Sequence, residues 1–378
     1  MITRFDDFCI HQTCEPIAQP ASSDRNFYDR YWASGFDTGG GFMFELAFGL
    51  YPNRRVMDAH FGVLIDGVQH CFHGSRRAPE DRSELVVGPL SLQILEPLRS
   101  FRLVIAPNDT GIACDLHFSA RTHPEEEPRS MLYDDGRLMM NTTRFTQLGR
   151  WQGHIVLHGR RIEVDVAHTL GARDKSWGIR PVGEPEGGAP SRELQVPRVY
   201  WIWAPLDFGH FATQFNTFEN ADGSASQLGA CRMPAGDDVD ALPAGGIEAM
   251  PIARHRIDWA PGTRFARTAH IDLTDTAGRL LSIELEPLLR FHVMGVGYHH
   301  PEWGHGVWKG ELVIAGETLE VDTLPALDHR YVHVHQMVRA TANGQVGYGT
   351  LETFTLGAHQ PSGFTAFLDG AVDRNSNT

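Results

Sequence analysis

The ten-residue run 171–180, with the sequence GARDKSWGIR, constrains this chain more than any other stretch. It places two arginines, a lysine, an aspartate and a tryptophan between glycines, after a strand-like segment at 161–168 and before a Gly/Pro-rich segment. We interpret it as a turn at the end of a strand. Because polar residues on loops held by a rigid scaffold are often functional, Asp174 is a candidate catalytic carboxyl and Trp177 a candidate substrate contact.

Alternation along an extended chain predicts how these side chains are distributed. Neighbours in sequence face opposite sides, so Arg173 and Lys175 are expected in water while Asp174 points inward with Ser176. A carboxyl that protonates an alkene must be neutral, which requires a desolvated pocket. The alternative is structural: Asp174 forms an ion pair with Arg173 or Arg180, and Trp177 closes the end of a barrel.

The rest of the chain has the rhythm of antiparallel sheet. Apolar, β-branched and aromatic runs recur about every ten residues and are separated by turn-forming dipeptides such as Asp66-Gly67 and Asn343-Gly344. The 39 glycines and 22 prolines fit this pattern, and long amphipathic helical patterns are scarce. The predicted strands of the first half are 41–48, 59–65, 91–95, 100–105, 111–118, 153–157 and 161–168. The sequence therefore predicts an all-β fold.

Two β domains are predicted from length and from a break in the rhythm. The chain has 378 residues, and residues 180–197 are rich in proline and glycine. We expect an N-terminal domain at 1–185 and a C-terminal domain at 186–378. The segments at 91–105 and 281–294 both contain Glu-Pro-Leu before an aromatic run, which suggests related halves. A second echo, between residues 151–178 and 303–336, places Asp328 near the position of Asp174.

Charge and hydropathy exclude several classes of protein. A net charge of −14 argues against nucleic-acid binding, which needs a basic surface. No apolar run approaches the roughly 20 residues of a membrane span, and residues 1–20 lack the apolar core of a signal peptide. The five cysteines are scattered without a CxxC pair. We expect a reduced, cytoplasmic protein, and composition leaves its oligomeric state open.

Aromatic and histidine residues supply the other candidates. Trp201 and Trp203 are expected on one face of a strand and Tyr200 on the other, and the candidate substrate-binding walls are Trp177, Tyr200, Trp201, Trp203, Phe211 and Phe215. Packing in a core is the alternative for all of them.

The chain has 20 histidines, and His299, His300 and His305 cluster around Glu302. His333 and His335 share a strand face. A metal needs three or four converging ligands, and His329 or Asp328 would have to complete that pair. Since no spacing identifies such a set, we expect neither a metal nor another cofactor.

The GARDKSWGIR run, the segment YHHPEWGHGVWKGE (298–311) and the paired β halves resemble the hydroxyneurosporene synthase, or carotenoid 1,2-hydratase, superfamily, and within it an uncharacterised bacterial subset. The resemblance spans residues 26–352 and differs at Lys175 and Ser176. It implies two lipocalin-like β domains and a cofactor-free enzyme that adds water to an isoprenoid-like hydrocarbon. It also implies that Asp174 corresponds to the catalytic aspartate of the family, with Trp177 nearby. His168 would correspond to a family histidine on the preceding strand.

Two functional hypotheses follow. The first is a cofactor-independent lyase or isomerase that acts on a hydrophobic terpenoid- or steroid-like substrate by hydration, dehydration, isomerisation or cyclisation. The second is a non-catalytic carrier of a hydrophobic small ligand, since the interior of a lipocalin-like barrel can hold one.

Overall fold

The computed structural model describes residues 7–9, 19–185, 187–189 and 198–373, and these residues form β-strands, short 3-10 helices and turns without any α-helix. They divide into two compact units. Unit 1 comprises Met1–Glu193 and Gly295–Leu319, and unit 2 comprises Leu194–Met294 and Glu320–Thr378. The first division point lies close to the predicted boundary at 185/186. The segment Gly295–Leu319, which that prediction placed in the C-terminal domain, clusters with unit 1.

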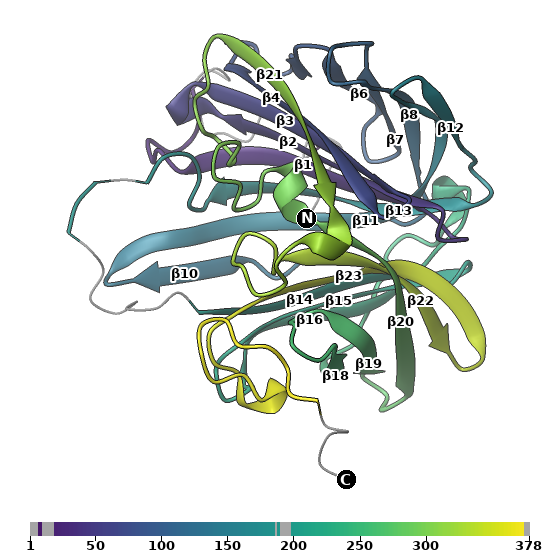
Figure 1. Ribbon diagram of the computed structural model, residues 1–378. Coiled ribbons are helices and arrows are strands. Elements are labelled where there is room, and N and C mark those ends of the chain that lie inside the picture. The colour runs from purple at the N-terminus through teal and green to yellow at the C-terminus, as the bar shows by residue number, and fades with distance from the viewer. Residues whose placement is uncertain (1–6, 10–18, 186, 190–197, 374–378) are drawn as a thin grey trace. The chain divides into compact units, whose positions relative to one another are not determined.

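Unit 1 is built on a curled 14-stranded sheet with the order β21-β4-β3-β2-β1-β13-β11-β8-β7-β6-β5, and β9, β10 and β12 also pair with β11 (Figure 1). Its strands are β1 (Phe27–Asp37), β2 (Phe42–Tyr51), β3 (Val56–Ile65), β4 (Val68–Arg77), β5 (Val86–Val87), β6 (Leu90–Glu96), β7 (Ser100–Ile105), β8 (Ile112–Ala120), β9 (Glu125–Glu126), β10 (Ser130–Asp134), β11 (Arg137–Leu157), β12 (Arg160–Val164), β13 (Thr169–Ile179) and β21 (Leu312–Glu320).

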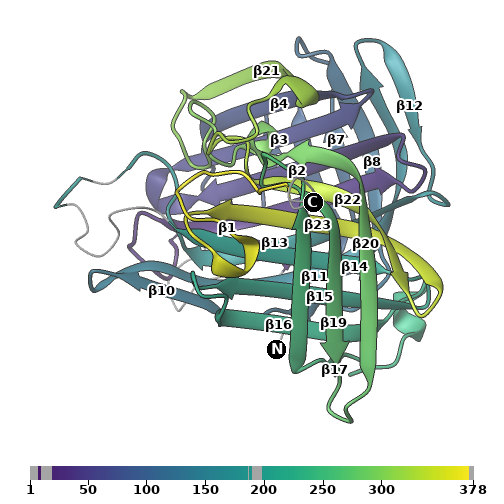
Figure 2. The ribbon, with the colours of Figure 1, turned by 60° about the horizontal axis from the view of Figure 1, so that its bottom comes forward.

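Unit 2 is a nine-stranded sheet with the order β17-β16-β15-β14-β23-β22-β20-β19-β18 (Figure 2). Its strands are β14 (Val199–Asp207), β15 (Phe211–Glu219), β16 (Ala225–Pro234), β17 (Glu248–Ala249), β18 (Ile252–Trp259), β19 (Ala266–Thr274), β20 (Leu280–His292), β22 (Val334–Ala342) and β23 (Gln345–Leu356). The 3-10 helices assigned within the described parts of the two units are η2 (Pro52–Arg54), η3 (Val239–Ala241), η4 (Val293–Val296), η5 (Val321–Thr323) and η6 (Gln360–Ser362).

The all-β, antiparallel prediction is confirmed, and so are its hairpin turns. Asp66 and Gly67 both have positive φ angles, of 52° and 78°, and Asn343 and Gly344 have φ angles of 50° and 78°. Two consecutive positive φ values define the type I′ turn that matches the twist of a two-residue hairpin. The dipeptides therefore identified where the chain reverses.

The Glu-Pro-Leu echo between the halves does not correspond to one local structure. In unit 1 it forms the turn between β6 and β7, where Leu98 has a φ of 61°. In unit 2 it lies inside β20, which continues through a register shift at Pro287. A bulge absorbs the proline there, because proline cannot donate a ladder hydrogen bond.

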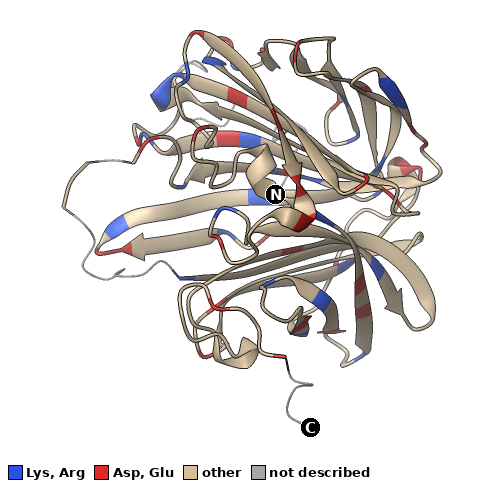
Figure 3. Ribbon diagram, in the orientation of Figure 1, with Lys and Arg blue, Asp and Glu red and all other residues tan. Residues whose placement is uncertain are grey.

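Each unit buries an aromatic core. In unit 1, the Trp151 ring lies 5.2 Å from Phe44 and 5.3 Å from both Phe101 and Phe118, and its indole nitrogen donates to the Ser34 carbonyl at 2.7 Å. In unit 2, the core includes Tyr200, Ile202, Leu206, Phe215, Trp259 and Phe364. Charged residues occur within the strands as well as at the turns (Figure 3).

The run 171–180 forms most of β13, a central strand between β1 and β11, and the prediction of a turn is wrong. Its flanking glycines explain the sequence pattern. A Cβ at Gly171 would stand 1.9 Å from the Ser34 carbonyl oxygen, and one at Gly178, where φ is 127°, would stand 2.1 Å from the Asn141 carbonyl oxygen. The glycines let β1 and β11 approach β13 closely.

Gly171→Ala should lower the free energy of unfolding by about 1–3 kcal/mol, the usual cost of forcing extra volume into a packed interior. Chemical denaturation at neutral pH would measure it. Gly187→Ala is the matched control, because nothing lies within 4 Å of a Cβ at Gly187. Equal stability of the two variants would contradict the close approach of β1 and β13.

Candidate functional site

The side chains of β13 alternate between two buried environments. Arg173 binds Asp7 Oδ1 at 2.7 Å and Gln147 Oε1 at 2.7 Å, and Lys175 forms an ion pair with Asp29. Arg173 is 2% exposed and the Lys175 side chain 0%. The expectation that these cations remain in water is therefore wrong. They are buried because each has a carboxylate partner inside unit 1.

Asp174 lies on the other side of β13, and it is 6% exposed. In the sheet it is directly opposite Trp32 of β1 and Thr146 of β11. Trp32 is 2% exposed, and its indole nitrogen donates to Glu45 Oε2 at 3.1 Å. We call Arg30, Trp32, Glu45 and Asp174 the Asp174 face, since these buried polar side chains come from three adjacent strands.

Arg30 supplies the positive charge of the Asp174 face. Burial works against the charged guanidinium, but attraction by Tyr298 and then by Asp174 raises the pKa of Arg30 above its ordinary value. Arg30 donates to the Tyr298 hydroxyl, and its Nη1 lies 2.9 Å from His305 Nδ1. Burial, followed by the charges of Arg30 and Arg180, keeps the pKa of His305 well below its usual range. A neutral His305 can then accept from Arg30 while its Nε2–H donates to the Val296 carbonyl at 2.8 Å.

Of the histidines predicted around Glu302, His300 accepts from the Glu302 backbone amide at 3.0 Å, and its other ring nitrogen meets the Glu317 carboxylate. Glu317 Oε1 lies 3.1 Å from His73 Nε2 and 3.2 Å from His300 Nε2, and His60 Nδ1 lies 2.9 Å from His73 Nδ1. Burial opposes ionisation of Glu317, but hydrogen bonds from His300 and His73 lower its pKa to about 2. Burial lowers the pKa of His73 to about 4.

Acidification from pH 6.5 to 4 should therefore destabilise the protein. His73 stays neutral in the folded state across this window, whereas the unfolded chain takes up a proton near pH 6.5. The unfolded state then binds more protons, which costs up to about 1.4 kcal/mol per pH unit for one such group. The stability that Glu317 contributes as a carboxylate is lost further down, between pH 4.5 and 2.

Urea denaturation at several pH values checks this expectation. His73→Gln should flatten the slope between pH 6.5 and 4, because the titrating imidazole is gone. His329→Gln is the control, since the His329 side chain is 59% exposed. An unchanged slope in His73→Gln would rule out His73 as a source of the acid sensitivity.

The structure separates the other predicted site residues of unit 1 from the Asp174 carboxyl. His168 lies in an exposed turn before β13, six residues from Asp174, which corresponds to about 20 Å at the rise of roughly 3.3 Å per residue of a strand. The Trp177 ring centre lies 5.8 Å from Lys175 Nζ, so the indole is on the opposite face of β13 from Asp174.

The predicted aromatic walls of unit 2 divide between two faces, as alternation predicted. Tyr200, Phe211 and Phe215 belong to the core of unit 2. Trp201 instead packs 4.3 Å from the Phe218 ring, and Trp203 lies 6.5 Å from the His335 ring.

Tyr200 and Phe215 also line a cavity of about 640 Å³ in unit 2. Along its wall, five polar side chains form a continuous series of hydrogen bonds and one close charge pair. Tyr200 Oη lies 3.1 Å from His255 Nε2, and His255 Nδ1 lies 3.4 Å from Glu219. Glu219 in turn lies 3.0 Å from His359 Nε2, and His359 Nδ1 lies 2.8 Å from Ser362 Oγ.

Burial raises the pKa of Tyr200 and lowers that of His255, which favours the neutral form of both groups. Glu219, His255 and His359 were not predicted as site residues from the sequence. Glu219 and His359 are 140 residues apart in the chain, so no local pattern links them.

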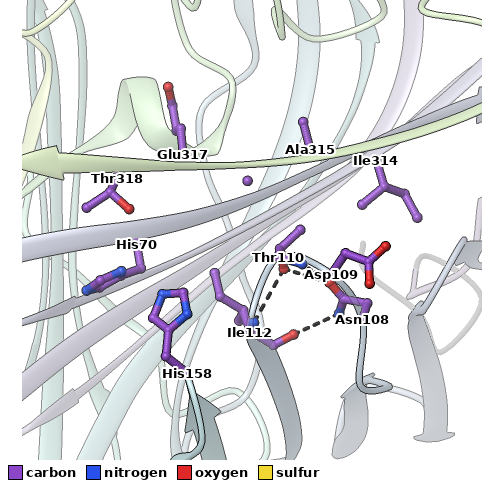
Figure 4. A pocket seen from close by; sticks show the side chains of 11 residues that line it. His70, Asn108, Asp109, Thr110, Ile112, His158, Ile314, Ala315, Glu317 and Thr318 are labelled. Atoms are coloured by element: carbon purple, nitrogen blue, oxygen red, sulfur yellow. Dashed lines mark hydrogen bonds between the residues drawn. The ribbon is translucent and has the colours of Figure 1, made fainter.

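A second cavity, of about 460 Å³, lies in unit 1 (Figure 4). Strand β21 forms one wall with Ile314, and the turn at Asn108 forms another. The Asn108 amide donates to the Ile112 carbonyl at 2.8 Å, and the rings of His70 and His158 meet at 5.3 Å. None of the predicted site residues lines this cavity.

Comparison with known proteins gives a family and a fold. A family model described as "Family of unknown function (DUF8625)" matches residues 2–365, so the chain belongs to that family. No curated protein matches the chain.

Among solved structures, a protein assigned as AttH from Nitrosomonas europaea is 13% identical with a TM-score of 0.51, and the match covers 87% of this chain and 92% of that one. Kievitone hydratase from Nectria haematococca is 11% identical with a TM-score of 0.48, covering 86% of this chain and 88% of that one. CghA is 8% identical with a TM-score of 0.46, covering 88% and 89%.

At such identities the AttH match shows the fold alone, and the two weaker superpositions add nothing to it. The resemblance to carotenoid 1,2-hydratases stays a prediction. No helix among the described residues is long and apolar enough to cross a membrane.

Proposed function

Because membership of a family of unknown function assigns no reaction, we propose from the geometry that this protein is an enzyme of the lyase or isomerase type. The enzyme would transfer a proton to or from a carbon atom of an apolar, terpenoid- or steroid-like substrate. Asp174 transfers the proton, and no cofactor takes part in that step. Hydration, dehydration, isomerisation and cyclisation share one protonated intermediate, so the proposal covers them as a single class.

The observation that carries the proposal is a carboxyl group, 6% exposed, beside a buried indole and a buried guanidinium on the rigid strands of one sheet. A carboxyl fixed on a strand can be held within the narrow geometry that proton transfer requires. The Trp32 indole stands opposite Asp174, and an aromatic face stabilises a nearby cation by about 0.5–2 kcal/mol. Arg30 adds a fixed positive charge that attracts the carboxylate left on Asp174 once its proton has been given up.

The experiment begins with the ligand. Small molecules that co-purify with the protein would be extracted, identified by mass spectrometry and returned to the protein in D₂O. Proton transfer to or from carbon would incorporate deuterium, which is seen as a mass increase in the substrate or product. A bound apolar ligand that shows neither conversion nor deuterium incorporation would overturn the enzymatic proposal.

A second candidate function, a carrier of a small ligand, is favoured by the cavity of about 640 Å³ in unit 2 that Tyr200 and Phe215 line. Ala253 also lines this cavity, and Ala315 lines the cavity of unit 1. If unit 2 carries the ligand, Ala253→Trp should abolish co-purification of the ligand while Ala315→Trp leaves it unchanged. The reverse pattern would exclude the unit 2 cavity as the carrier site.

A further inference from the structure

Three ligand-type side chains meet on two neighbouring strands of unit 2. His333 immediately precedes β22, His335 lies in β22, and Glu352 lies in β23. His335 and Glu352 are direct partners across the β22–β23 ladder. Residues two apart on an extended chain share a face, so His333 lies on the same side as His335. The exposed fractions of the three residues are 4%, 3% and 8%.

Their donor atoms converge on one point. His333 Nε2 lies 2.7 Å from Glu352 Oε1, and His335 Nε2 lies 3.4 Å from the same oxygen. One donor atom from each residue lies within 4.8 Å of the other two. Ligands bound to one zinc ion at about 2.0–2.2 Å stand roughly 3–3.5 Å from one another, so small adjustments of these side chains would enclose an ion.

Each imidazole also contacts a neighbouring aromatic ring. The His333 ring stacks on the Phe354 ring with centres 4.5 Å apart and planes 18° apart. The His335 ring centre lies 6.5 Å from that of Trp203. The backbone at His333 is fixed by the Val293 amide, which donates to the His333 carbonyl at 3.4 Å. Such supporting contacts orient metal ligands in known sites.

We propose that His333, His335 and Glu352 bind one divalent transition-metal ion of the zinc or ferrous-iron class. Two imidazoles and one carboxylate form a set that occurs in catalytic zinc sites and in non-haem iron sites. Three protein ligands leave at least one coordination position for water or a small molecule. The proposal does not depend on the proton transfer assigned to Asp174.

The sequence led us to expect no metal, and the structure supplies a ligand that local spacing does not show. The pair His333 and His335 was recognised from the sequence, but the third ligand was sought at His329 or Asp328. In the structure, Asp328 binds the Arg330 guanidinium, with Oδ2 2.6 Å from Nη2. The third group, Glu352, is supplied by the next strand and is therefore invisible to local spacing.

A competing set of three groups exists in unit 1, formed by Cys71, His73 and Glu317. It differs from the proposed set in containing a thiol in place of one imidazole, so sulfur ligation would distinguish the two sites. It provides the matched control for the experiment.

The test measures metal binding by the full-length protein. After exhaustive chelation, Zn²⁺ would be added and the bound metal determined by calorimetry and elemental analysis. One equivalent is expected in the wild type and in Glu317→Gln. Glu352→Gln and His335→Gln should each lose the site at micromolar zinc. No binding by the wild type, or retention of the full equivalent by Glu352→Gln, would overturn the proposal.

A spectroscopic measurement decides the question even if a variant fails to fold. Wild-type protein loaded with Co²⁺ should show visible ligand-field bands without the near-ultraviolet charge-transfer band of a cobalt–thiolate bond. X-ray absorption at the zinc edge should show nitrogen and oxygen neighbours, with imidazole scattering. Sulfur in the first coordination shell would place the ion at Cys71 and refute the assignment.

Discussion

Replacement of Asp174 by Asn is expected to lower turnover by about 10²–10⁴-fold, the usual contribution of a positioned acid or base, and to leave the fold and apolar-ligand binding nearly intact. The amide keeps the volume of the carboxyl but cannot exchange a proton with substrate. Turnover of the identified substrate and the dissociation constant of that ligand would be measured on the same preparations.

Asp115→Asn serves as the matched control for this substitution. Asp115 forms an exposed ion pair with Arg102 at 2.6 Å in the same unit, and its loss should not affect turnover. A variant Asp174→Asn with full activity would exclude Asp174 as the proton-transfer group. Unfolding of that variant, with Asp115→Asn intact, would assign Asp174 a structural role.

Asp328, the residue that the sequence echo places nearest to Asp174, is not a suitable replacement as a proton donor. A hydrogen bond from Arg330 lowers the pKa of Asp328 to about 2, so its carboxyl is ionised at neutral pH. The pH dependence of turnover then distinguishes the possible roles of Asp174. A rate that falls as the pH rises indicates a proton donor, and one that rises with pH indicates a base.

Asp29→Asn is expected to reduce the free energy of unfolding by about 3–5 kcal/mol, the range observed when one partner of a buried ion pair is removed. Asp29 pairs with Lys175, and its Oδ2 lies 3.7 Å from Arg82 Nη2. All three side chains are at most 1% exposed, so the two cations would lose their common carboxylate away from water. Chemical denaturation at neutral pH would give the value.

Two comparisons make this measurement specific. Lys175→Met should cost less, because Asp29 keeps Arg82 as a partner. Asp115→Asn, in the exposed pair with Arg102, should cost under about 1 kcal/mol. A loss for Asp29→Asn as small as that of Asp115→Asn would show that the buried pair contributes no more than a surface pair.

The sequence predicted the class of fold and the hairpin turns because both depend on local chemistry. It failed at residues 171–180, where density of charge indicated a turn. The cations are tolerated in a central strand because carboxylates from distant segments neutralise them, and Asp7 lies 166 residues from Arg173. Local patterns carry no information about such partners.

The same limit explains which site residues were found. Alternation correctly separated Tyr200 from Trp201 and Trp203, since it follows from strand geometry alone. Glu352 and Glu219 were missed because each meets its histidines across strand pairings or loop closures. A carboxylate partner can be recognised only once the order of the strands is known.

Strand β13 is hydrogen-bonded on both edges, to β1 and to β11, along most of its length. Backbone amides in such a position open only in the largest unfolding events, so those near Asp174 should be among the slowest in the protein to exchange with deuterated solvent. The Asp174 carboxyl is thus attached to a strand whose backbone stays hydrogen-bonded while the surface loops fluctuate. If Asp174 transfers the proposed proton, changes in the surrounding turns would alter which ligand binds without moving the Asp174 carboxyl.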